Sequence, residues 1–442
     1  MLVGAMNDAP AQGASALALP RLCGRIVDAR GVLIRVAGLS LHIGERVRIR
    51  SGREGVEQQG EVVGLEGPLA LVLPLNGLRG LSSICEVESG GRHGLDVDAV
   101  LARGRVIDGL GEPLDGGPTL PRTHAPVVAS VAPLERPPID RPLVSGWRAM
   151  DGLLTCGEGQ RIGIFAPAGA GKSTLLGSFA QAIACDTVVL ALIGERSREV
   201  ADFLHQHLGQ RRGATIAVVA TSDRSPAERL CAAELAARLA CRLREQGQHV
   251  LLLVDSLTRY ARAGRELGLA LGEPAGSGGF PPSVQARLAQ LVEAGGRSAS
   301  GSVTGFYTLL CDHDDAPLAE EVRSLMDGHI QLSSALAEAG HFPAIDLLRS
   351  QSRLSDRLVP SEQRLHAARF RQWLARYAEL EWLIQVGEYR PGADAEADLA
   401  IAHRPKLLQF LQQPRNDASL QQTRDALARI FDPEPTRTGL HG

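Results

Sequence analysis

The sequence RIGIFAPAGAGKSTLLGSFAQAIA occupies residues 161–184 and joins three elements in a fixed order. A short apolar run comes first, a loop of small residues follows, and a helix-forming stretch opens at Gly171-Lys172-Ser173. A phosphate-binding loop requires this order, because small residues let backbone N–H groups surround a phosphate and the helix N-terminus favours negative charge. We therefore predict a phosphate loop over residues 166–174, in which Ala166 stands where the strict pattern has Gly.

The predicted loop assigns separate roles to its residues. Lys172 reaches the β- and γ-phosphates of a nucleotide, and the Ser173 hydroxyl ligates Mg²⁺. The alternative is a Gly-rich turn between a strand and a helix that carries a Lys by chance. The residues predicted to contact the nucleotide here are Ala168, Gly169, Ala170, Gly171, Lys172, Ser173 and Thr174.

Lysine usage supports the first interpretation. Among 47 basic residues only Lys172 and Lys406 are lysines. Arg can replace Lys where a site needs only positive charge, but its planar fork is bulkier than a compact ammonium group. A lysine retained in a phosphate loop therefore indicates a site that needs a point charge. Lys406, in HRPKLLQF, is expected to lie on a helix surface.

Strands and helices alternate downstream of the loop. This alternation predicts an α/β fold with a mostly parallel sheet and helices on both faces. The expected strands are 161–166, 187–195, 215–222, 249–256 and 303–312, and the expected helices between them are 172–184, 197–209 and 226–247.

The flanking regions have different patterns. Residues 1–20 are expected to form a disordered tail, and residues 21–98 to form short strands of a small barrel or sandwich. We assign residues 99–358 to the α/β domain, with 99–150 as its linker and lead-in, and residues 359–442 to a helical domain, because the strand pattern stops near Leu358.

Two acidic residues end apolar runs. Asp255 follows HVLLLV, and an acid in this position after a phosphate loop is typical of a Walker B aspartate that holds Mg²⁺ through water. Glu195 ends the run from Val188 and could orient or deprotonate an attacking water. Each acid alone could be a solvated carboxylate at a strand end. Together with a phosphate loop in one parallel sheet they indicate a hydrolytic site.

Composition excludes several classes of protein. The chain has 442 residues and a net charge of −3, which disfavours a nucleic-acid-binding role. No apolar run approaches the ~18 residues of a membrane span. The first twenty residues contain no Lys or Arg, unlike a signal peptide. The seven cysteines are scattered, which favours reduced thiols in a cytoplasm.

Several motifs resemble those of rotary-type hexameric ATPases. These are AGAGKST at 168–174, GERSRE at 194–199, DSLTRYA at 255–261 and GHFPAIDLLRSQSRL at 340–354. Other stretches resemble the type III secretion ATPases, a group that includes the flagellar export ATPase. They are RGRVIDGLGEPLDG at 103–116, GQRIGIFAPAGAGKSTLL at 159–176, RELGLALGEP at 265–274, PPSV at 281–284, SVTGFYTLL at 302–310 and VRSLMDGHIQLS at 322–333, and the resemblance covers about residues 22 to 400.

The resemblance implies an N-terminal β-barrel, a RecA-like P-loop core and C-terminal helices. It also implies a homohexamer that binds ATP and Mg²⁺ between subunits. Glu195 takes the general-base position, and Arg196 beside it is expected to fix its orientation. Arg259 matches an arginine that faces the γ-phosphate, although it could instead pair with Asp255 four residues earlier.

Two further residues gain roles from the resemblance. Arg353 matches the arginine finger that enters the neighbouring subunit's site, with Arg349 as its competitor. Phe342 matches an aromatic residue that stacks on adenine, although it could be a core residue.

The same resemblance implies a place in the cell and a set of partners. ATP hydrolysis would power protein export through a type III secretion system, in the cytoplasm and peripherally at the inner membrane. The expected partners are stator and central stalk proteins, chaperone–effector complexes and the export gate, without nucleic acid. A flagellar-type export ATPase and a rotary ATP synthase catalytic subunit remain alternatives.

Two alternatives belong to other classes of protein. A hexameric RNA helicase would need aromatic base-stacking residues, and residues 1–100 contain no Trp, Tyr or Phe. A non-hydrolytic nucleotide-binding scaffold would lack Glu195.

The chain departs from the family pattern at two places. The acidic loop 312–317 is about two residues shorter than usual, and we expect it to be solvated near the γ-phosphate rather than to hold a metal. The segment 276–279, Gly-Ser-Gly-Gly, replaces a stretch containing Thr and Arg and is expected to be mobile.

Overall fold

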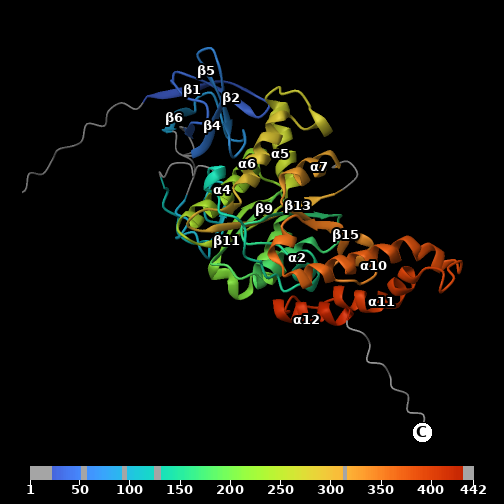
Figure 1. The fold of residues 1–442 in the computed structure, drawn as a ribbon. Coiled ribbons are helices and arrows are strands. Elements are labelled where there is room, and N and C mark those ends of the chain that lie inside the picture. Colours follow the sequence, from blue (N-terminus) through green and yellow to red (C-terminus); the bar gives the residue numbers. More distant parts are fainter. Residues whose placement is uncertain (1–21, 51–56, 92–96, 124–130, 312–315, 432–442) are drawn as a thin grey trace, which may run out of the picture. The chain divides into compact units, whose positions relative to one another are not determined.

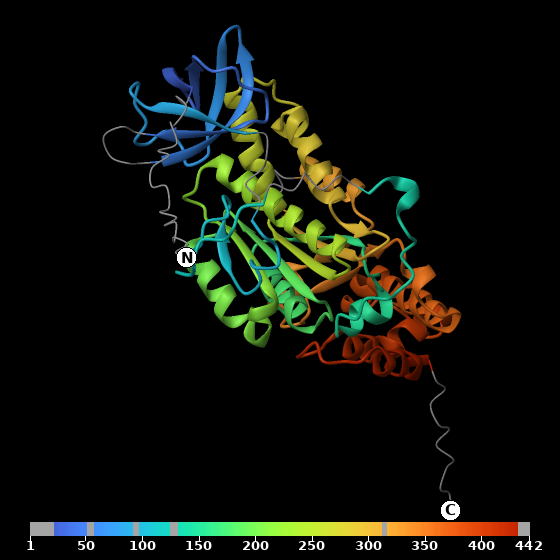
Figure 2. The ribbon, with the colours of Figure 1, turned by 90° about the vertical axis from the view of Figure 1, so that its left-hand side faces the viewer.

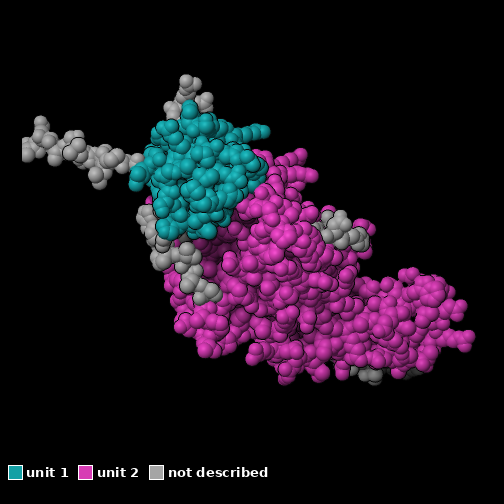
Figure 3. Space-filling model, turned by 90° about the horizontal axis from the view of Figure 1, so that it is seen from above, with its two compact units in different colours: residues 1–92 teal, residues 93–442 magenta. Residues whose placement is uncertain are grey.

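The computed structural model describes residues 22–50, 57–91, 97–123, 131–311 and 316–431. The predicted tail at 1–20 and the core of the acidic loop, 312–315, lie outside the described residues. The chain divides into two compact units, residues 1–92 and 93–442 (Figure 3). The domain boundaries proposed from the sequence remain a prediction.

The first unit is a closed six-stranded barrel with the strand order β1-β2-β5-β4-β3-β6. Apolar residues alternate along each strand and fill its interior; Ile34, Ile49 and Val72 are fully buried. The predicted barrel is therefore confirmed, and the alternative of a β-sandwich is wrong. Its strands are β1 (Cys23–Arg30), β2 (Leu33–Ala37), β3 (Arg46–Arg50), β4 (Glu57–Glu66), β5 (Leu69–Pro74) and β6 (Glu86–Gly91).

The second unit is built on a nine-stranded, mostly parallel sheet with the order β15-β14-β8-β13-β11-β9-β10-β7, to which β12 adds an antiparallel pair with β13 (Figure 1). All five predicted strands are present, as β8, β9, β10, β11 and β13. Its strands are β7 (Val106–Asp108), β8 (Arg161–Ala166), β9 (Thr187–Ile193), β10 (Thr215–Ala220), β11 (His249–Asp255), β12 (Gly296–Arg297), β13 (Ser302–Leu310), β14 (Gly328–Leu332) and β15 (Ile345–Ser352).

Helices cover both faces of this sheet, as the α/β pattern predicts. The predicted helices are α2, α3 and α4, and the Ser225 hydroxyl accepts a hydrogen bond from Glu228 N–H at the start of α4. The helices through the core are α1 (Arg148–Leu153), α2 (Lys172–Ala182), α3 (Ser197–Gln206), α4 (Pro226–Glu245), α5 (Leu257–Ala270), α6 (Pro282–Glu293), α7 (Ala316–Leu325), α8 (Ser334–Glu338) and α9 (Ser355–Leu358), with 3-10 turns at Pro133–Glu135, Gly209–Ala214 and Ser277–Gly279.

One departure from the sequence-based expectation concerns the core. The segment 99–150, expected to be a linker and lead-in, contributes the strand β7, which pairs in parallel with β10 at the sheet edge. The segment 276–279 forms a turn in which Gly279 N–H donates to Gly276 O at 3.0 Å, and its expected mobility stays a prediction.

The chain after Leu358 is helical, as predicted. It forms α10 (Ser361–Gln385), α11 (Ala395–Leu411) and α12 (Leu420–Phe431). Phe370 and Phe410 from these helices share one apolar cluster with Phe179 of α2 and with Leu190 and Leu251 of the sheet. The helical region therefore shares a core with the α/β region and belongs to the same compact unit.

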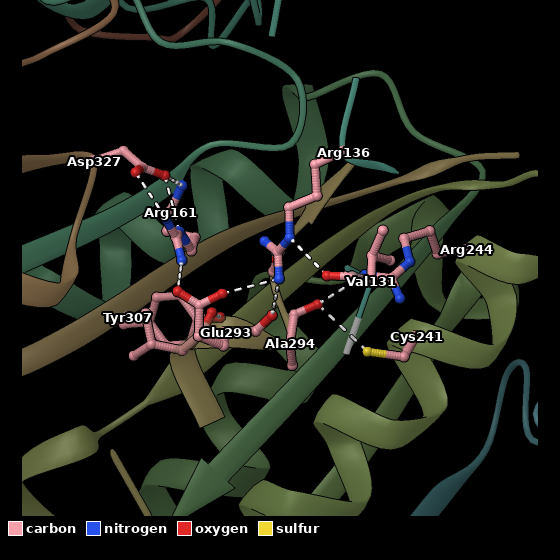
Figure 4. A network of polar contacts seen from close by, with 11 residues as sticks. Val131, Arg136, Arg161, Cys241, Arg244, Glu293, Ala294, Tyr307 and Asp327 are labelled. Atoms are coloured by element: carbon pink, nitrogen blue, oxygen red, sulfur yellow. Dashed lines mark hydrogen bonds and ion pairs between the residues drawn. The ribbon is translucent and has the colours of Figure 1, made fainter. Parts of the chain in front are cut away.

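A polar network lies where β8 begins, at the end of this strand away from the phosphate loop (Figure 4). The Arg161 guanidinium donates to both carboxylate oxygens of Asp327 at 3.0 Å and also pairs with Glu293. Arg136 contacts the same Glu293 at 2.9 Å, and the buried Arg244 donates to Ala294 O at 3.2 Å. The network fixes the start of β8 to the end of α6 and to the turn before β14.

Candidate active site

The phosphate loop runs from β8 into α2 as the sequence predicts. Gly169 and Gly171 have φ angles of 79° and 85°, in the left-handed region that side chains disfavour, so the loop path requires glycine there. Lys172 is the first residue of α2, and Ser173 and Thr174 are exposed on the same turn. The first N–H groups of α2 have no partner within the helix and are available to an anion.

Lys172 extends across the sheet edge to both predicted acids. Its Nζ atom lies 2.5 Å from Asp255 Oδ1 and 3.6 Å from Glu195 Oε1. Asp255 ends β11 and Glu195 follows β9, and the two strands are parallel neighbours. The carboxyl ends of parallel strands meet at one edge, so the fold brings together three residues that are far apart in the sequence.

Asp255 is 2% exposed and receives a second hydrogen bond, from Thr308. The Thr308 hydroxyl on β13 donates to Asp255 Oδ1 at 2.7 Å and is itself fully buried. The carboxylate is therefore held from both sides, by Lys172 and by the neighbouring strand. Sequence reasoning missed Thr308, because its hydroxyl is one of several on a buried strand that also carries Ser302, Thr304 and Tyr307.

Glu195 is 8% exposed and its environment disfavours the charged form. Burial and the nearby Asp255 carboxylate raise its pKa to about 7, against the opposing effect of the Lys172 ammonium. Its Oε1 atom has no hydrogen-bond partner, while Arg259 Nη2 lies 3.1 Å from Oε2. A carboxyl group with a pKa near neutrality and a buried oxygen that makes no hydrogen bond can accept a proton from a water that reaches it.

Arg259, and not Arg196, contacts Glu195. The Arg196 side chain is 80% exposed and its Nη1 atom lies 3.3 Å from Glu199 Oε1, so the expected contact with Glu195 is wrong for this structure. The reason is geometric: α3 begins at Ser197 and leaves Arg196 outside, facing solvent.

Arg259 reaches Glu195 because of Gly194. The Arg259 guanidinium also donates to Gly194 O, and a Cβ atom on Gly194 would lie 2.9 Å from Arg259 Cδ. The Gly in GERSRE therefore makes room for this arginine, a role that the sequence alone did not indicate. Arg259 therefore pairs with Glu195 and not with Asp255, the alternative partner considered from the sequence.

A cavity of about 200 Å³ opens beside these groups. Its hydroxyl and carboxylate oxygens are the ligand types that Mg²⁺ prefers, and Mg²⁺ usually takes one or two protein ligands plus phosphates and water. In the described part of the chain, no three His, Cys, Asp or Glu side chains gather into a group that could hold a metal ion. The cavity is lined by Ser173, Leu192, Glu195, Glu199, Val200, Asp202, Phe203, Gln206, His207 and Asp255.

Phe342 lies beside the phosphate loop. A Cβ atom on Gly171 would be 3.9 Å from Phe342 Cε1, and the phenylalanine is 49% exposed. It is therefore not a core residue. Its exposed ring next to the loop has the position that a base-stacking residue needs.

The main chain of Arg353 contacts Asp327 and not the residues around Lys172. It follows β15, its N–H donates to Asp327 O at 3.0 Å, and its side chain is exposed. Arg349 on β15 is exposed too. Because both side chains are exposed, both arginines remain candidates for the arginine finger.

Taken together, the loop, the paired acids and the parallel sheet define a P-loop nucleotide-binding protein. The family model "ATP synthase alpha/beta family, nucleotide-binding domain" matches residues 146–352, and the model "T3SS EscN ATPase C-terminal domain" matches residues 359–429. The type 3 secretion system ATPase of Xanthomonas euvesicatoria is 46% identical over 423 residues, which cover 94% of this chain and 96% of that protein.

Solved structures agree with the sequence comparison. The assembled ATPase EscN from the enteropathogenic E. coli type III secretion system has a TM-score of 0.85 and 41% identity, and covers 92% of this chain and 100% of EscN. EscN in complex with its central stalk EscO has a TM-score of 0.84, with the same identity and coverage. The chain belongs to the family of type III secretion system ATPases. No helix in the described ranges is long and apolar enough to cross a membrane.

Proposed function

We propose that this protein hydrolyses ATP at sites between the subunits of a homohexamer and so powers protein export. The observation that carries the proposal is that Lys172, the first helical residue after the phosphate loop, contacts both Glu195 and Asp255, and that these two acids and Ser173 line one cavity. Family membership supports the secretion role, and the match of the C-terminal model favours it over an ATP synthase subunit.

The arrangement of charges suggests how nucleotide would be accommodated. Lys172 is paired with Asp255, and an incoming triphosphate would compete for its ammonium group. Asp255 and the Ser173 hydroxyl would hold Mg²⁺, which when bound neutralises charge on the β- and γ-phosphate oxygens. Thr308 keeps Asp255 in place during this exchange.

Glu195 would act on the attacking water. Its unpartnered Oε1 faces the side of Lys172, while Arg259 holds Oε2 at 3.1 Å. A carboxyl group held at one oxygen presents the other in a fixed direction, which orients the water and accepts its proton. Arg259, through its contact with Glu195, would also interact with the γ-phosphate when it is cleaved from ATP.

Arg353 would complete the site of the neighbouring subunit. Its exposure, and its backbone contact with Asp327 at the end of β8 away from the phosphate loop, suit an arginine that acts across an interface, where a finger contributes 10³–10⁵ in rate. The assembled state of EscN supports a hexameric arrangement. Phosphate release should therefore rise more than linearly with protein concentration.

A mixing experiment tests the shared site. Lys172→Ala and Arg353→Ala proteins should each be inactive, but mixed assemblies should regain phosphate release, because some interfaces combine an intact Lys172 with an intact Arg353. Arg349→Ala serves as the matched control and should stay active alone. Absence of recovery on mixing, or full activity in dilute monomer, would contradict a finger that acts between subunits.

The export role would place the protein in the cytoplasm, peripherally at the inner membrane. ATP turnover would detach effectors from chaperones, unfold them and deliver them to the export gate, with stator and stalk proteins as partners; the EscN–EscO complex supports a stalk partner. Native mass spectrometry of complexes captured with the tagged protein should find these partners and six copies of the chain. Complexes free of any secretion component would contradict the proposal.

A further inference from the structure

The connection between α11 and α12, residues 412–419, contacts segments that surround the phosphate loop although it belongs to the helical C-terminal region. Helix α1 packs on α11 and α12 in the same area (Figure 2). The residues of this connection make hydrogen bonds that span more than 200 positions in the sequence. The contacts therefore join the connection between the C-terminal helices to α2 and to the main chain of Phe342.

Gln413 is the buried centre of this connection, at 6% exposure. Its Oε1 atom accepts a hydrogen bond from Arg148 N–H at 2.9 Å, at the start of α1. Its Nε2 group donates to Gly146 O at 2.7 Å and to Arg415 O at 2.5 Å. Because every polar group of this side chain is satisfied by backbone, its position is fixed relative to the segment that leads into α1.

The backbone of Gln413 holds the residue that is expected to stack on the base. Gln413 N–H donates to Phe342 O at 2.9 Å. The Phe342 ring is half exposed beside Gly171, and Pro343 after it has no N–H to donate. The hydrogen bond from Gln413 therefore restrains the main chain that carries the ring.

A second contact fixes the same connection to the phosphate-loop helix. The Asn416 side chain donates to Ser178 O of α2 at 2.8 Å. Trp147 Nε1 donates to the Ser178 hydroxyl at 2.8 Å, and a Cβ atom on Gly146 would lie 2.1 Å from Asn416 O. The glycine allows the two backbones this close approach, which leaves the connection little freedom to shift alone.

We propose that Gln413 is a positioning residue for the nucleotide base, which sets the place of the Phe342 ring and couples base binding to the C-terminal helices. The proposal rests on the proposed function, ATP binding at this site, and on the expectation from the family resemblance that Phe342 stacks on adenine. The phosphates are held by the loop itself, so the contribution of Gln413 should concern the base and not the phosphates. Coupling of this kind is reciprocal: a partner that shifts α11 or α12 would change base affinity, and bound base would resist that shift.

The test compares a ligand that has a base with one that lacks it. We would measure binding of ADP and of inorganic pyrophosphate to the full chain with Mg²⁺, by calorimetry. Gln413→Ala should weaken ADP binding about fivefold, the lower range for losing a base–aromatic stack, and leave pyrophosphate affinity unchanged. The matched control is Gln412→Ala, the exposed neighbour of the same type, which should change neither.

A double-mutant cycle locates the effect. In a Phe342→Ala background, Gln413→Ala should no longer weaken ADP binding, because the Gln413 side chain, which fixes the backbone N–H that holds Phe342 O, would act on the base only through the Phe342 ring. Gln413→Met keeps the side-chain length and provides a second variant if the alanine form folds poorly; it should show the same fivefold loss.

Three results would overturn the assignment: unchanged ADP affinity in both Gln413 variants, an equal loss for pyrophosphate, or a persistent effect without Phe342. Wild-type protein that fails to bind ADP would instead overturn the proposed function, and the assignment with it.

Discussion

Replacing Glu195 with Gln should stabilise the nucleotide-free protein at high pH while it removes the proposed base. The carboxyl group is 8% exposed, lies in the field of Asp255, and has a pKa raised to about 7 from an ordinary 4.5. Between these two values the folded chain binds more protons than the unfolded chain. The stability that this group contributes is therefore present at low pH and is lost as the pH rises through 7.

The size of the effect follows from the shift. At pH 8 the charged carboxylate costs the folded state about 3 kcal/mol relative to its ordinary pKa, since one pKa unit corresponds to about 1.4 kcal/mol. At pH 5 the cost is below about 1 kcal/mol. A neutral Gln of the same shape removes this cost, so the gain in free energy of unfolding should be about 2–3 kcal/mol larger at pH 8 than at pH 5.

Thermal unfolding at the two pH values, without nucleotide and at one protein concentration, measures this difference. For a unit of about 350 residues the relative gain corresponds to an increase in Tm of about 3 °C at pH 8. Glu338→Gln, at the exposed end of α8, is the matched control and should show no pH-dependent gain. If Glu195→Gln lowers Tm equally at both pH values, the argument from buried charge is wrong.

Three other changes test single contacts. Lys172→Arg keeps the charge but should reduce kcat for phosphate release at least about 100-fold, whereas Lys406→Arg on α11 should be silent; equal activity of the two variants would remove the special role of the ammonium group. Thr308→Val should lower the free energy of unfolding by about 1–3 kcal/mol, because a buried carboxylate loses a donor, and denaturant titration measures it; an unchanged midpoint would contradict the argument. Arg259→Gln should reduce kcat about tenfold or more while Arg196→Gln stays near wild type in the same assay, and the reverse order would refute the observed pairing.

Local pattern predicted the elements that carry the chemistry. The phosphate loop depends on consecutive residues, so its strand, turn and helix can be read from one short stretch. Strand β9 is followed by Glu195 and strand β11 ends in Asp255, and parallel neighbours must place these ends at one edge. The lysine at 172 stood out in a chain that otherwise uses arginine, and its position beside both acids agrees with a need for a point charge.

Short or irregular elements gave no such pattern. Strand β7 has three residues, too few for an alternation to be visible, and it forms because β10 offers a free edge. The antiparallel pair β14 and β15 extends the opposite edge of the sheet, and no periodic pattern in the sequence predicts that pairing.

The sequence by itself therefore determined which residues could do chemistry, because motifs record the local backbone that phosphate binding demands. Only the tertiary structure decided how they are held. Thr308 meets Asp255 because β13 pairs with β11, and Arg259 rather than Arg196 contacts Glu195 because Gly194 leaves room for the Arg259 side chain. Such contacts depend on strand register and helix ends across 50 or more positions, and a sequence pattern that spans a few residues does not encode them.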